Sequence, residues 1–119
     1  MKLPELFQEI IATYRRHGWR LRQVLLCRET QAEFGNRGKG PFADATIHEA
    51  PFDALWFARP SPGGREAWEL RLVAEQPYAL FEAFKADQPE EQREEVRRAM
   101  EARMAQTLIS VTDLPKESG

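Results

Sequence analysis

The chain has 119 residues, 42% hydrophobic and 30% charged, which is typical of one globular domain (1–119) and excludes an intrinsically disordered chain. A single cysteine, Cys27, excludes an internal disulfide bond. The longest apolar run, Ala54–Ala58, is far shorter than the roughly 20 residues of a membrane span, and the N-terminus lacks a signal-peptide core. We therefore expect a cytoplasmic protein that does not bind membranes.

The net charge of −2 conceals an asymmetry along the chain. Residues 1–39 carry eight Lys/Arg and four Asp/Glu, a balance of +4, whereas residues 40–119 carry nine and fifteen, a balance of −6. Such polarity can attract an anionic partner or favour head-to-tail self-association. Alternatively, the basic and the acidic part of the chain neutralise each other in the folded protein.

The chain begins with a predicted helix, Pro4–His17, which carries an apolar stripe at three- and four-residue spacing and is followed by Gly18 at the C-cap position. The alternating segment Trp19–Glu29 then predicts a strand, with Arg20, Arg22 and Val24 on one face. Residues 30–51 predict a long connection with a short strand near Ala45–His48.

A hairpin is predicted for residues 52–76, in which "PSPGG" forms the turn between an apolar strand and a regularly alternating one. In the second strand Trp68 and Leu70 share one face, and Glu69 and Arg71 the other. Two helices are predicted next, a short one from Pro77 and a longer one from Asp87, before a partly flexible tail, 107–119.

The order of elements is thus helix, strand, loop, two strands and two helices. It predicts a two-layer α+β fold, in which an antiparallel sheet of three or four strands is covered by the C-terminal helices. The first two strands are apolar on both faces, so either the C-terminal helices also cover the second face or a second copy of the chain does. We expect the second copy, in a homodimer.

Candidate binding residues lie on the predicted strands. Their arginines and tryptophans can bind a ligand or a partner on a sheet face or in the groove between the sheet and the C-terminal helix; the set is Arg20, Arg22, Trp56, Trp68 and Arg71. Glu69 and Glu75 can instead pair with these arginines, and the acidic overall charge argues against nucleic acid as the partner.

A second candidate site is the glycine-rich stretch "GNRGKGP", residues 35–41, where backbone amides with Arg37 and Lys39 can grip an anion. It lacks the Walker pattern, and a solvated loop explains it equally well. His48, Glu49 and Asp53 lie close together in sequence, but their spacing matches no metal motif. Cys27 lies in an apolar stretch, which is typical of a buried cysteine.

No catalytic set, metal site or cofactor motif follows from these residues. The sequence therefore favours a non-enzymatic protein-interaction or ligand-binding module that dimerises. One alternative is a small enzyme acting on an anionic metabolite, with loop 35–41 as a lid and His48 or Glu49 as base. The other is a protein that binds single-stranded RNA through a basic sheet face.

Overall fold

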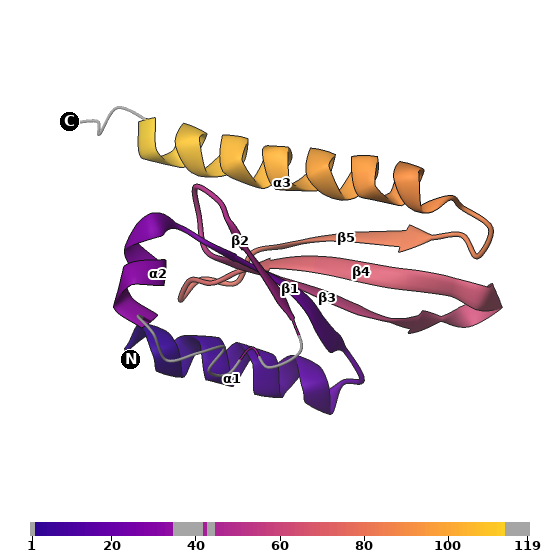
Figure 1. Cartoon of the computed structure of the whole chain (residues 1–119), viewed down its shortest axis with the longest axis horizontal. Helices are drawn as coiled ribbons and strands as arrows, with labels where there is room; N and C mark the ends of the chain where they lie inside the picture. The colour runs from indigo at the N-terminus through magenta and orange to yellow at the C-terminus, as the bar shows by residue number, and fades with distance from the viewer. Residues whose placement is uncertain (1, 35–41, 43–44, 114–119) are drawn as a thin grey trace. The chain divides into compact units, whose positions relative to one another are not determined.

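The computed structural model describes residues 2–34, 42 and 45–113, the last five of these by their backbone alone. By its contacts the chain divides into two compact units, residues 1–87 and residues 88–119. Among the described residues, the first unit holds helices α1 and α2, strands β1 to β5 and the 3₁₀ turn η2, and the second holds the long helix α3 (Figure 1). The predicted α+β class, with its N-terminal helix, is confirmed.

Helix α1, Leu3–Arg16, forms as the apolar spacing predicts and buries Phe7, Ile10 and Ile11 against the sheet (Figure 1). It ends at Gly18, whose φ of 84° lies in the left-handed region that residues other than glycine avoid. The amides of Gly18 and Trp19 then bond back to the carbonyls of Arg15 and Tyr14, each at 3.0 Å. This turn leads the chain directly from α1 into the sheet.

The sheet has five strands in the order β2-β1-β3-β4-β5. Their bounds are β1 Arg20–Leu26, β2 Thr46–Glu49, β3 Ala54–Ser61, β4 Arg65–Leu72 and β5 Ala79–Phe84. All neighbours are antiparallel except β1 and β2, which are parallel. The hairpin of β3 and β4, joined by the 3₁₀ turn η2 (Pro62–Gly64), is confirmed, and β3 is the central strand.

A β-bulge in β1 changes which side chains reach the core. The register with β3 shifts between Leu21 and Gln23, so Arg22 is the extra residue. As a result Trp19 and Leu21 contact the same core as Val24 and Leu26, although strict alternation predicts opposite faces.

The core between α1 and the sheet is rich in aromatic rings. Phe7 meets Phe34 and Phe42 edge-on, each with ring centroids 5.4 Å apart. Tyr14 stacks on Phe57 of β3 with centroids 4.1 Å apart. These contacts hold α1 on one face of the sheet.

Three sequence expectations need correction. The predicted long connection contains a helix, α2 (Arg28–Phe34). The segment predicted as a short helix from Pro77 is strand β5, paired with β4 in an unbroken register. The sheet therefore has five strands, and the predicted short strand near Ala45–His48 is β2, which runs parallel to β1.

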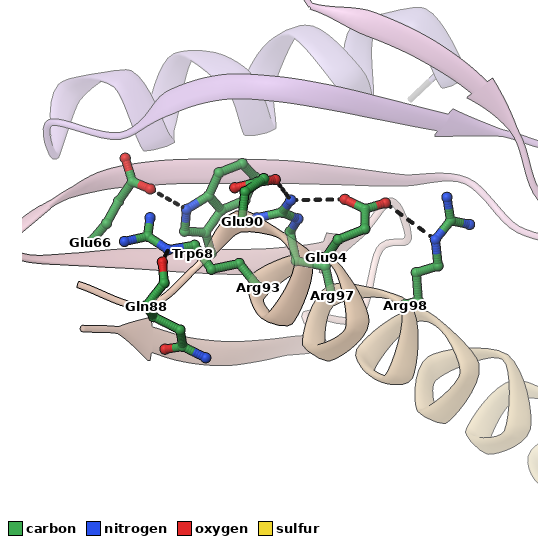
Figure 2. A network of polar contacts seen from close by, with 8 residues as sticks. All are labelled: Glu66, Trp68, Gln88, Glu90, Arg93, Glu94, Arg97 and Arg98. Atoms are coloured by element: carbon green, nitrogen blue, oxygen red, sulfur yellow. Dashed lines mark hydrogen bonds and ion pairs between the residues drawn. The ribbon is translucent and has the colours of Figure 1, made fainter. Parts of the chain in front are cut away.

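The second unit consists of helix α3, Glu90–Asp113, which continues through residues predicted to belong to a loose tail. Arg97 donates to Glu90 and, at 2.8 Å, to Glu94, which also pairs with Arg98 at 3.2 Å (Figure 2). Such pairs, one turn or two apart, stabilise the helix from within.

The packing of this helix on the sheet stays a prediction, as does the single-domain organisation. Within the described residues, no helix has both the length and the apolar character required to cross a membrane.

Candidate functional site

A cavity of about 330 Å³ opens beside the first half of β1. Strand β2 pairs with β1 only from Gln23 onward, so residues 20–22 have no described strand on that side. The space is bounded by the end of α1, the start of β1 and the residues before β2. Its lining consists of Arg15, Trp19, Arg20, Leu21, Arg22, Phe42 and Ala45.

Each element places its arginine for a local reason. Arg15 lies in the last turn of α1, where cations are favourable for the helix dipole. The Gly18 turn brings β1 back beside that helix end, and Arg20 is the first residue of the strand. Arg22 is the bulged residue, so its position departs from the ordinary alternation of the strand.

Trp19 gives this cavity a rigid wall. Its side chain is buried and meets the ring of Tyr14, and the guanidinium of Arg59 lies over its indole at 4.4 Å. Arg59 also donates to the His17 carbonyl at 2.7 Å, which ties β3 to the end of α1. The wall is thus held from two sides by cation–π and ring contacts.

The charged side chains among the described lining residues are all positive. The described lining residues include three arginines and no Asp or Glu, and none of these arginines forms an ion pair with a carboxylate of the described residues. Arginine stays protonated at any physiological pH and presents several N–H donors in one plane. A bound anion would relieve the mutual repulsion of these cations and satisfy their donors.

The structure brings three of the five binding residues proposed from the sequence close together. Arg22 lies over the ring of Trp68 at 5.2 Å, and Trp56 meets Trp68 edge-on with centroids 5.9 Å apart. The indole N–H of Trp68 donates to Glu66 at 2.7 Å (Figure 2). Arg22, Trp56 and Trp68 are thus brought together, but both tryptophans are buried, and Arg20 lines the cavity.

Arg71 is not brought to that group. It pairs with Leu55 in register and lies on the α1 side of the sheet, beside Tyr14 and Glu69. The Tyr14 hydroxyl donates to Glu69 there. Burial and, next, the bond to Glu69 raise the pKa of Tyr14 well above its ordinary value. Arg71 therefore belongs to a cluster that fastens α1 to the sheet.

Sequence reasoning missed Arg15 and Trp19 as lining residues. Arg15 looked like an ordinary helix-end cation, and Trp19 like a strand residue. The stretch "YRRHGWRLR" does carry a signal, because five of its nine residues are Arg or His around one tryptophan. The turn and the bulge that gather these side chains have no such signal.

The polar residues around Asp53 form a structural joint. Asp53 accepts from the Cys27 amide at 2.8 Å and from the Thr30 hydroxyl at 2.6 Å, and its carbonyl accepts from the Val73 amide at 2.9 Å. It thereby links β1, α2, β3 and the end of β4. This arrangement explains the acidic residue after Pro51 without invoking catalysis or a metal.

The remaining candidate residues do not form a site. His48 and Glu49 are exposed on β2, where Glu49 makes only a 3.9 Å surface pair with Arg28. No group of metal-ligating side chains occurs among the residues that the structure describes. Arg37, Lys39 and the rest of loop 35–41 lie outside the described residues.

Comparison with known proteins found no match for this chain: no family model, no curated protein and no solved structure resembles it significantly.

Proposed function

We propose that this protein is a non-enzymatic binding protein for a small anionic ligand, held in the cavity between α1 and β1. The observation that carries the proposal is the lining itself, whose described residues include Arg15, Arg20 and Arg22 and no Asp or Glu. Guanidinium groups bind phosphate and carboxylate oxygens in a bidentate manner, so both chemistries suit the site. We also propose a cytoplasmic location, on the sequence grounds given above.

The size of the cavity limits the ligand. About 330 Å³ lies at the low end of the range for ligand pockets, which favours a compact molecule such as a sugar phosphate or a tricarboxylate. Trp19, Leu21 and Phe42 supply an apolar wall for its carbon skeleton. Binding energy would then come mainly from charge-assisted hydrogen bonds.

Binding without reaction is favoured over the enzyme alternative. His48 and Glu49, the bases considered for an enzyme, do not line the cavity, and its described lining residues offer no other general acid or base. The RNA alternative needs exposed aromatic faces on which bases can stack, whereas Trp56 and Trp68 are 0% and 4% exposed.

The test is isothermal titration calorimetry with inorganic phosphate, glucose 6-phosphate and citrate. We expect at least one of them to bind, and the affinity to fall as NaCl rises from about 20 mM to about 300 mM. Replacing Arg15, Arg20 or Arg22 by Gln should weaken binding about tenfold, because each change removes one charged donor. Arg65→Gln is the matched control, since Arg65 is exposed at the hairpin and does not line the cavity.

Two results would contradict the proposal. One is that none of the three anions binds at low ionic strength. The other is that the three cavity variants bind as tightly as Arg65→Gln, which would place the anion elsewhere on the protein.

A further inference from the structure

The two edges of the sheet differ in how they are protected. Strand β2 has only four residues, all exposed, and its last residue, Glu49, is charged. Strand β5 has six residues in an unbroken register with β4, contains no proline or bulge, and carries one charge, Glu82. Natural sheets protect long edges against pairing with another chain by charge, proline or bulges. Among the described edge strands, β5 is the longer one, and its single charge, Glu82, is its only protection of this kind.

The most exposed large apolar side chain of the described residues lies on this edge. Phe81 of β5 is 58% exposed, although its neighbours along the strand include the buried Phe84. For residues 79–83 the structure records backbone pairing with β4 alone, so the outer row of amides and carbonyls has no described partner. An extended strand of another chain would satisfy both the backbone row and the exposed ring.

We propose that β5 is a dimerisation edge, at which a second copy of this chain adds its own β5 in antiparallel orientation. The register places Phe81 opposite Phe81 of the other copy, on the two-fold axis. Glu82 then faces the apolar Leu80 rather than its own copy. A register centred on Glu82 would instead set two carboxylates directly opposite each other, which is unfavourable.

Charge therefore disfavours the register centred on Glu82, and the register centred on Phe81 brings the two exposed rings into apolar contact. A six-residue strand pair buries less surface than a standard stable interface, so the dimer should be weak and concentration-dependent. This inference concerns an interaction surface on β5. It is independent of the anion cavity, which lies beside β1.

The first measurement is sedimentation velocity of the full chain over a wide concentration range. We expect a monomer–dimer equilibrium, with the dissociation constant raised about tenfold or more by Phe81→Glu, which removes the ring and adds like charges on the axis. Ile47→Glu is the matched control, because Ile47 is the other exposed large apolar side chain and lies on the opposite edge, β2. It should leave the dimer unchanged.

A crosslinking experiment tests the register without relying on loss of association. In a Cys27→Ala background, a short bis-maleimide reagent should crosslink the Phe81→Cys variant into a dimer, because side chains directly opposite have Cβ atoms about 4.5–5.5 Å apart. Ile47→Cys in the same background measures chance collisions. The inference is overturned if the chain is monomeric at all concentrations, if Ile47→Glu weakens the dimer as much as Phe81→Glu, or if the Phe81→Cys variant crosslinks no faster than the Ile47→Cys variant.

Discussion

At the scale of single residues, two polar side chains connect elements that lie far apart in the sequence. Asp53 links the end of β1 to the start of α2 through its bonds to Cys27 and Thr30. Tyr14 links α1 to β4 through Glu69 while its ring stacks on Phe57. Both act in partly buried positions, where a lost hydrogen bond leaves its partner without full hydration.

Replacing Tyr14 by Phe should keep the ring stack and remove the bond to Glu69. We expect the free energy of unfolding to fall by about 1–2 kcal/mol near neutral pH. The pKa of Tyr14 is raised in the folded state by burial and by Glu69, so the neutral hydroxyl stabilises the fold. That contribution is complete below about pH 10, the ordinary tyrosine value, and is lost as the pH rises further, because the unfolded tyrosine ionises first.

Urea unfolding at about pH 8 and about pH 11 checks both parts of this prediction. The wild-type protein should lose more stability between these pH values than Tyr14→Phe does. Tyr78→Phe, which alters the only other tyrosine and retains Tyr14, should show the wild-type loss. Equal alkaline losses in the wild type and in Tyr14→Phe would show that Tyr14 is not the group responsible.

At the scale of elements, the sequence predicted best those segments whose periodicity is long and regular. Helix α1 and the β3–β4 hairpin have clear patterns, and both form as expected. Strand β5 was misread because Tyr78, Phe81 and Phe84 recur every three residues, whereas its two faces show no clean apolar–polar alternation. In so short a segment periodicity does not identify a strand, and the pairing with β4 decides the outcome.

The turn of the hairpin offers a test at this scale. Gly63 has a φ of 77°, and a Cβ added there would meet nothing within 4 Å, so only the backbone conformation would be strained. Gly63→Ala should therefore lower the free energy of unfolding by about 1 kcal/mol, measured by urea denaturation. Gly63→Asn should cost less, because asparagine tolerates the left-handed region better. If the two variants were equally stable, backbone strain would not be the cause.

At the scale of the whole molecule, part of the positive charge of residues 1–39 lies at the cavity. The three cavity arginines all come from residues 1–39, the stretch with the balance of +4. Arg20 and Arg22 could be proposed from the sequence because they lie in a visibly basic strand. Their grouping with Arg15 could not, since it depends on the Gly18 turn and on the bulge at Arg22. The same bulge separates Arg22 from Arg71, which strict alternation had placed on one face.

Ligand binding should therefore be measurable as stability of the whole molecule. The cavity combines residues from α1, β1 and the segment before β2, so only the folded chain can form it. A ligand at a hundred times its dissociation constant should add about 2.7 kcal/mol to the free energy of unfolding, which for a chain of this size raises the melting temperature by on the order of 10 °C. The measurement is a thermal melt with the tightest anion found by calorimetry.

Multivalent anions also stabilise many proteins without binding to a site, because they are excluded from the surface. The comparison of Arg22→Gln with Arg65→Gln separates the two effects. A site-specific anion should stabilise Arg65→Gln as it does the wild type and should stabilise Arg22→Gln much less, at equal ionic strength. Equal stabilisation of both variants would assign the effect to general exclusion and would remove the arginine-lined cavity as its cause.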